Sequence, residues 1–177
     1  MSKLGNAPRS DIGPIAEYLR DVTKLPPELV RPEQLNFQIN IVNQVVNATT
    51  PSQRVDPEYT FAMRRIKGFV SDPVLLSPQI FLTEFNIRDQ GRARGGVFTN
   101  RVNMGVLVGA GGPSHDMIWD SFYAFVPGAD MIVDWFPNLA AFGANTNITF
   151  GVSITGDLVR TRRLADGTLT IPGVTDR

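Results

Sequence analysis

Apolar side chains occupy every second position between residues 147 and 155, and this alternation constrains the fold more than any other feature of the sequence. The two sets are Ile148, Phe150, Val152 and Ile154 against Asn147, Thr149, Ser153 and Thr155. Successive side chains of a β-strand point to opposite faces of the sheet, so the pattern predicts a strand with one face on a core and the other in water. Antiparallel sheets commonly have this arrangement.

The same two-residue period returns along most of the chain. Proline and glycine separate the segments, as in Gly109–Pro113 and Pro127-Gly128. The expected strands cover residues 35–41, 59–63, 81–87, 102–108, 117–126, 131–136 and 147–155, followed by a hairpin of 158–164 and 169–171 around Asp166-Gly167. No helical pattern separates these strands. We therefore predict an all-β fold, an antiparallel β-sandwich that is a jelly roll of about eight strands.

A helical period precedes the first strand. After a possible N-cap at Ser10, apolar side chains recur at helical spacing at Ile12, Ile15, Ala16, Leu19 and Val22. Prolines 26, 27 and 32 predict an extended connector over residues 25–33, because proline lacks the N–H that regular structure uses. We divide the chain into an N-terminal arm (1–33), with a short amphipathic helix and a proline-rich connector, and a β-sandwich domain (34–177). The helix is expected to dock on its own domain or on a neighbouring subunit, because so short a helix is marginal alone in water.

Charge and composition argue against several functional classes. Seventeen basic and seventeen acidic residues give a formal net charge of zero, so no specific nucleic-acid binding is expected. The chain has no cysteine, which excludes disulfides, thiolate metal sites and cysteine nucleophiles. No apolar run approaches the ~20 residues of a membrane span, and residues 1–9 lack the apolar region of a secretion signal. We expect a chain that is soluble when made.

The sequence offers no complete set of catalytic or metal-binding residues. His115 is the only histidine, and adjacent side chains in Ser114-His115-Asp116 cannot converge as a catalytic triad requires. Four aspartates could bind calcium through oxygen, but they match no calcium-loop spacing and are interpreted as solvated turn positions. They are Asp116, Asp120, Asp130 and Asp134. We expect no cofactor, no metal and no enzymatic activity.

Two arginine clusters are candidates for contacts with a partner. Guanidinium groups bind carboxylates or phosphates, and the zero net charge favours the carboxylates of a neighbouring subunit. Arg88, Arg92, Arg94 and Arg101 form the first cluster, and Arg160, Arg162 and Arg163 form the second. With the apolar stripe of the helix, the selected assembly or interface candidates are Ile15, Leu19, Val22, Arg92, Arg94, Arg160, Arg162 and Arg163.

Aromatic residues concentrate between positions 119 and 136. The six are Trp119, Phe122, Tyr123, Phe125, Trp135 and Phe136. Core packing is the preferred interpretation. A sugar-stacking platform or an interface anchor becomes the leading one if several of them prove exposed.

The order of parts resembles single jelly-roll capsid, minor capsid and decoration proteins of icosahedral viruses, including tailless bacteriophages. The segments that carry the resemblance are Phe85–Arg92 (FNIRDQGR), Trp119–Gly128 (WDSFYAFVPG) and Val133–Phe136 (VDWF). The resemblance covers residues 35–160 and is one of pattern, without a diagnostic motif. It implies a structural subunit that contacts copies of itself and other virion proteins through its arm and sheet edges. Such a protein would be found in the virion, and in the host cytoplasm before assembly.

Two alternative functions stay open. The first is a carbohydrate- or ligand-binding β-sandwich that uses the aromatic segment 119–136 and the nearby aspartates. The second is an acid/base enzyme without a metal, built on a jelly roll and using Glu84 or the aspartates. A cupin-like metal enzyme would need several histidines, and the chain has one.

Overall fold

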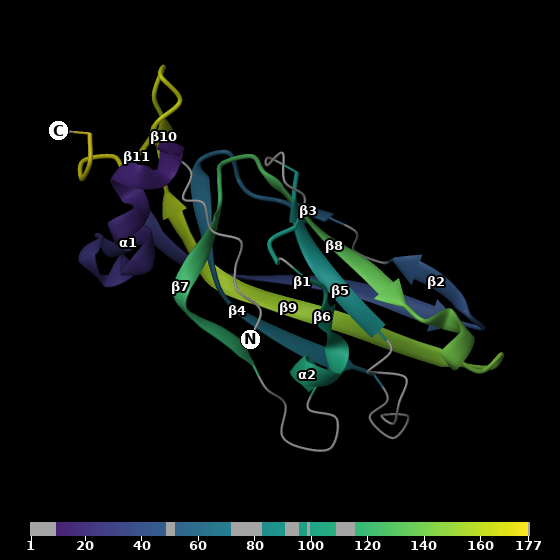
Figure 1. Ribbon diagram of the computed structural model, residues 1–177. Coiled ribbons are helices and arrows are strands. Elements are labelled where there is room, and N and C mark those ends of the chain that lie inside the picture. The colour runs from purple at the N-terminus through teal and green to yellow at the C-terminus, as the bar shows by residue number, and fades with distance from the viewer. Residues whose placement is uncertain are drawn as a thin grey trace.

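The computed structural model describes residues 10–48, 52–71, 83–90, 96–98, 100–108 and 116–176. In these ranges the chain forms two main antiparallel sheets, with the N-terminal helical segment at one end (Figure 1). The five-stranded sheet has the order β2-β1-β9-β4-β7, and the four-stranded sheet has the order β3-β8-β5-β6. A hairpin of β10 and β11 lies next to the N-terminal segment. The prediction of an antiparallel β-sandwich with a short N-terminal helix is confirmed.

The elements of the five-stranded sheet are β1 (Val30–Val42), β2 (Val45–Ala48), β4 (Tyr59–Val70), β7 (Met117–Phe125) and β9 (Asn147–Arg160). Those of the four-stranded sheet are β3 (Ser52–Arg54), β5 (Thr83–Asp89), β6 (Val102–Asn103) and β8 (Asp130–Pro137), and the hairpin consists of β10 (Arg162–Arg163) and β11 (Leu169–Thr170). The helical elements are the 3-10 turns η1 (Ser10–Ile15), η2 (Val22–Lys24), η3 (Pro27–Leu29) and η6 (Leu139–Ala141), with the α-helices α1 (Ala16–Arg20) and α2 (Met104–Val108).

The strand pairing is that of a jelly roll. The four pairs are β1 with β9, β3 with β8, β4 with β7, and β5 with β6, all antiparallel. If the short β2 and the terminal hairpin are set aside, the first strand pairs with the last, the second with the seventh, and so on inward. A long hairpin rolled into two facing sheets produces this nesting.

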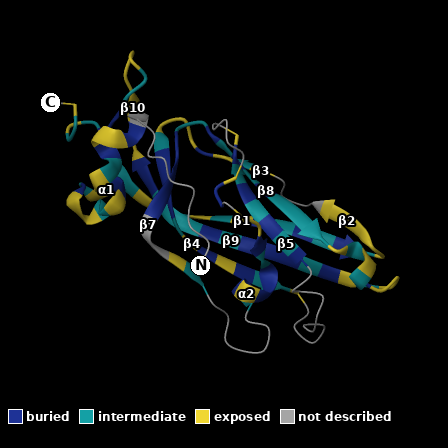
Figure 2. Cartoon of the chain, viewed as in Figure 1, coloured by how far each residue is buried: buried dark blue, intermediate teal, exposed yellow. Residues whose placement is uncertain are grey.

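The alternation in the sequence determines which side chains enter the core. In β9 the four apolar side chains of the alternating set are fully buried, and in β1 Phe37, Ile39 and Ile41 are also fully buried. The intervening polar residues of both strands are exposed or half-buried (Figure 2). The strand predicted over 147–155 is confirmed and extends to Arg160, so that β9 pairs along its length with β1 and along most of it with β4.

A β-bulge interrupts the alternation in β4. Met63 pairs with Gly156 and Arg65 with Thr155, so Arg64 is an extra residue opposite β9. A Cβ at Gly156 would lie 2.1 Å from the carbonyl oxygen of Ala62, which explains why this position is glycine. The extra residue moves Ile66, instead of Arg65, to the core face.

Arg64, the bulge residue, joins the N-terminal segment to the sandwich. Its Nε donates to Asp157 Oδ2 at 2.5 Å, and its Nη2 and Nη1 donate to the carbonyl oxygens of Leu19 at 2.8 Å and Arg20 at 3.3 Å. These carbonyls belong to the last turn of α1. No further helical turn follows whose N–H groups could donate to them. Ile12, Ile15, Leu19 and Leu25 are buried in the same hydrophobic core as the strands. The segment therefore docks on its own domain.

Two predictions about local structure were wrong. The connector expected over residues 25–33 ends early, because β1 begins at Val30. Pro32 is tolerated there because β2 covers only residues 39–42 of β1, which leaves this part of the strand at the sheet edge. The strand expected over 102–108 stops at Asn103 and continues as α2. A Cβ at Gly68 would lie 2.7 Å from Leu107 Cβ, so α2 packs closely on β4.

Gly156→Ala should destabilise the protein by about 1–3 kcal/mol, because the new methyl group meets the backbone of β4 and not a movable side chain. Gly143→Ala is the matched control, since the nearest atom to its Cβ would be Thr146 Oγ1 at 3.6 Å. Urea unfolding of both variants measures the difference. Equal stability of the two would contradict the close approach at the bulge.

Leu19→Ala should lower the free energy of unfolding by about 2–5 kcal/mol, as expected for a buried leucine, because the Leu19 side chain is 0% exposed. Arg20→Ala is the control: that side chain is exposed, and its backbone carbonyl, which accepts from Arg64, is unchanged. Thermal or chemical unfolding tests the pair. If Leu19→Ala leaves stability unchanged, the helical segment does not belong to the folded core.

Candidate functional site

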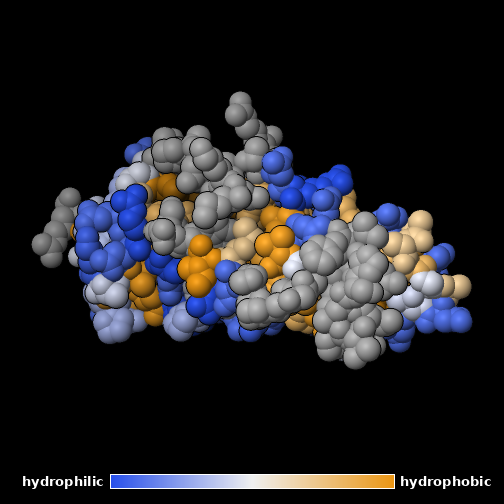
Figure 3. Space-filling view, turned by 60° about the horizontal axis from the view of Figure 1, so that its bottom comes forward, coloured by the Kyte–Doolittle hydropathy of each residue, from blue (hydrophilic) through white to orange (hydrophobic). Residues whose placement is uncertain are grey.

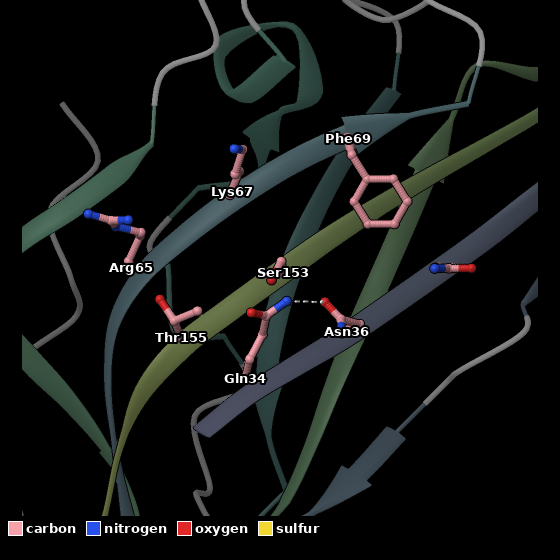
Figure 4. Close-up of a pocket in the computed structure, with 8 residues that line it drawn as sticks. Gln34, Asn36, Arg65, Lys67, Phe69, Ser153 and Thr155 are labelled. Atoms are coloured by element: carbon pink, nitrogen blue, oxygen red, sulfur yellow. Dashed lines mark hydrogen bonds between the residues drawn. The ribbon is translucent and has the colours of Figure 1, made fainter. Parts of the chain in front are cut away.

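The outer face of the five-stranded sheet carries a regular array of side chains, which we call the polar grid. It has three rows across β1, β9 and β4, fixed by the strand register. The rows are Gln34–Thr155–Arg65, Asn36–Ser153–Lys67 and Gln38–Gly151–Phe69. Figure 4 shows the labelled members of the grid projecting from these strands on one side of the sheet. They line a depression of about 540 Å³.

Phe69 provides the one aromatic surface of the grid. A Cβ at Gly151 would lie 2.0 Å from Cζ of the Phe69 ring, so the ring rests directly on the glycine backbone. Gly151 is buried, whereas Phe69 is only half-buried. One face of the ring therefore covers β9, and part of it stays open to solvent.

The charges of the grid are positive and only partly compensated. Arg65 Nη1 lies 3.4 Å from Asp116 Oδ2, a pair whose arginine side chain is half exposed. Lys67 is exposed, and among the described residues no acidic group forms an ion pair with it. Gln34 Nε2 donates to Asn36 Oδ1 at 3.2 Å. The remaining polar atoms of the grid are amides and hydroxyls, which both donate and accept hydrogen bonds.

The outer face of the four-stranded sheet is different, because two of its arginines, Arg88 and Arg101, pair with acidic side chains. Nε and Nη2 of Arg88 donate to the two carboxylate oxygens of Asp134, each at 2.8 Å. The hydrogen bonds to Asp134, together with the negative charge of that carboxylate, raise the pKa of the Arg88 guanidinium above its usual value. Arg101 lies 3.6 Å from the centre of the Phe136 ring and 3.8 Å from a Glu84 oxygen. Each of these cations is thus neutralised in place.

Those predicted interface residues that the structure describes do not form one surface. Ile15 and Leu19 are fully buried and Val22 is half-buried against the core, so a contact with another subunit would require the segment to undock. Arg160 is exposed and lies 3.4 Å from Glu58, and Arg162 and Arg163 are exposed on β10. Arg92, Arg94 and His115 lie outside the described residues. The intersubunit role of Ile15, Leu19, Val22 and the arginines stays a prediction.

The aromatic segment 119–136 mainly belongs to the core. Phe122, Tyr123 and Phe125 are buried, and Trp135 and Phe136 are half-buried. The side chain of Trp119 lies outside the described part of the chain. None of the five described side chains is exposed, so the condition for an aromatic binding platform in this segment is not met.

The aspartates considered for calcium are dispersed. Asp116 pairs with Arg65 and Asp134 with Arg88. Within the described ranges, no three histidine, cysteine, aspartate or glutamate side chains gather as a metal site would need. The described helices include none with the length and apolar content that crossing a membrane requires.

The polar grid was not predicted as a site from the sequence, although the sequence indicates the positions of some of its residues. The alternation placed Asn36 and Gln38, and Ser153 and Thr155, on the faces opposite the core. The pattern does not identify Arg65, Lys67 and Phe69, because the two-residue period of Tyr59, Phe61 and Met63, if continued, places them on the core face. Compared with models of protein families and with curated protein sequences, the chain matches none of them.

Gly151→Ala should cost about 1–3 kcal/mol of stability in the wild-type chain, because the methyl group displaces the Phe69 ring. In a Phe69→Ala background the same change should be neutral or stabilising, since alanine is otherwise favoured over glycine in a strand by roughly 0.5–1 kcal/mol. A double-mutant cycle by urea unfolding gives the coupling between the two positions. An identical cost in both backgrounds would show that the ring does not rest on Gly151.

Proposed function

We propose that the protein is a structural subunit of a viral particle, a capsid or capsid-associated protein. The observation that carries this proposal is a jelly roll whose five-stranded sheet ends in two apolar edges. The nested pairing from β1·β9 to β5·β6 is the fold implied by the resemblance to single jelly-roll capsid proteins. Fold alone does not define function, so the edges are the stronger part of the argument.

The two outermost strands of the five-stranded sheet each expose apolar side chains. Val45 and Val46 on β2 are 58% and 36% exposed, and Ile118 on β7 is 62% exposed. An open strand edge offers unpaired backbone groups to another chain, and native proteins usually protect such edges with charge or proline. Figure 3 shows apolar areas separated by hydrophilic ones on the side of the molecule that it presents.

Edges at opposite sides of one sheet suit repeated assembly. A contact between the β2 edge of one copy and the β7 edge of the next would join two different surfaces, and such head-to-tail contacts generate rings or extended arrays. The formal net charge of zero lets copies accumulate without mutual repulsion. In such an assembly the exposed side chains of Arg160, Arg162 and Arg163 would contact carboxylates of neighbouring subunits.

Lysine substitutions at the edges test the proposal. Val45→Lys with Val46→Lys, and Ile118→Lys separately, should each reduce assembly at least about tenfold, because an edge charge opposes strand addition. Val106→Lys is the control, since Val106 is 54% exposed on α2, which belongs to neither edge strand. Light scattering and electron microscopy of the full chain follow the assembly.

The expected result is large particles from the full-length chain and from Val106→Lys, with smaller species from the edge variants. A full-length chain that remains monomeric at every concentration, with no larger complex recovered, would overturn the proposal. Equal assembly of edge variants and control would overturn the assigned edges.

A further inference from the structure

We propose that the polar grid binds an anionic oligosaccharide, with carboxylate or sulfate groups, on the outer face of the five-stranded sheet. This binding function is separate from assembly through the sheet edges. It rests on the chemistry of eight lining side chains and on their spacing.

The dimensions of the grid match a short saccharide. Its three strands span about 10 Å across the sheet, and its three rows span about 14 Å along the strands. Gln34, Asn36, Arg65 and Lys67 are exposed, and the remaining lining side chains are half-buried. An extended, shallow, rigid surface of this kind suits a ligand that lies flat on it.

The composition of the grid selects a polyhydroxylated ligand. Three amides on β1 and two hydroxyls on the neighbouring strand β9 provide hydrogen-bond donors and acceptors side by side. They can therefore accept from, or donate to, the hydroxyl groups of a sugar. The Phe69 ring, held flat by Gly151, offers its open side to the apolar face of a sugar ring. Strand register fixes the backbone positions of these groups, so binding has to order their side chains but not a loop.

The cations select a ligand with negative charge. Lys67 stands in the middle row, between the Arg65 and Phe69 rows, on the same strand face. Arg65 keeps a half-exposed guanidinium although it contacts Asp116. None of the described residues that line the depression is acidic. A carboxylate or sulfate placed over Lys67 would form a charge-assisted hydrogen bond while its sugar hydroxyls meet the neighbouring amides.

Nucleic acid fits the face less well. Phosphates follow each other along a strand at short intervals, so binding normally uses many cations along a track. The grid supplies two cations among five neutral polar side chains, and the formal net charge of the chain is zero. The composition therefore favours a sparsely charged saccharide.

Calorimetric titration of the full chain with three probes of similar length tests the inference. The probes are a heparin tetrasaccharide, a tetragalacturonate and the neutral maltotetraose. At least one anionic probe should bind, and it should bind at least about tenfold more tightly than the neutral one. Lys67→Gln should weaken that binding about tenfold, and Lys67→Arg should retain most of it. Phe69→Leu, which keeps an apolar cover on Gly151, should weaken it about fivefold.

Arg162→Gln is the matched control, because it removes the same charge from an exposed residue of β10, beyond the end of β9. Its affinity should equal that of the wild type, and thermal unfolding should show all variants folded. Equal losses in Lys67→Gln and Arg162→Gln would overturn the inference, as would equal binding of the neutral probe or binding of neither anionic probe. Tighter, Lys67-dependent binding of a single-stranded oligonucleotide would also overturn it. The edge variant Val45→Lys with Val46→Lys, on β2, should bind the probe normally, because β2 pairs only with residues 39–42 of β1, beyond the grid. That result separates this inference from assembly.

Discussion

The bulge at Arg64 is the constraint on which the rest of the structure depends. Gly156 lets the backbone of β4 approach β9 closely, and the extra residue reverses the alternation of β4 from that point onward. Phe61 and Met63 face the core before the bulge, and Ile66 does so after it. Without the inserted residue, Arg65, Lys67 and Phe69 would enter the core, where charged groups are strongly disfavoured.

The bulge also divides the outer face of the five-stranded sheet into two parts. On one side, Arg64 bridges Asp157 and the last carbonyls of α1, and the N-terminal segment covers the sheet. Ala62 and Ala124, which pair on that part, are buried. On the other side the grid stays open and polar. The bulge thus has two effects. It fixes the N-terminal segment, which was predicted to be an arm, on the sheet, and it turns Lys67 and Phe69 towards solvent.

Much of the fold could be predicted because strand periodicity is local. The alternation at residues 147–155 and 35–41 identified the core faces of β9 and β1, and Pro127-Gly128 identified the β7–β8 turn, where Gly128 has φ +74. The strand expected at 102–108 failed because apolar residues in a short run do not distinguish a strand from a helix. There the deciding contact is distant in sequence: Gly68 makes room for Leu107. The polar grid could not be predicted for a related reason. The bulge that exposes it depends on a glycine in another strand, and no local sequence pattern indicates such a bulge.

By itself the sequence determined the fold class, the approximate strand positions and the neutral, polar character of the surface. Those properties follow from side-chain period and composition, which each segment carries alone. Only the tertiary structure decided that the N-terminal helix packs on its own domain, that the first strand pairs with the last, and that Gln34, Lys67, Phe69 and Thr155 share one face. These outcomes depend on the register between strands far apart in the chain, and a shift of one residue would reverse every one of the faces.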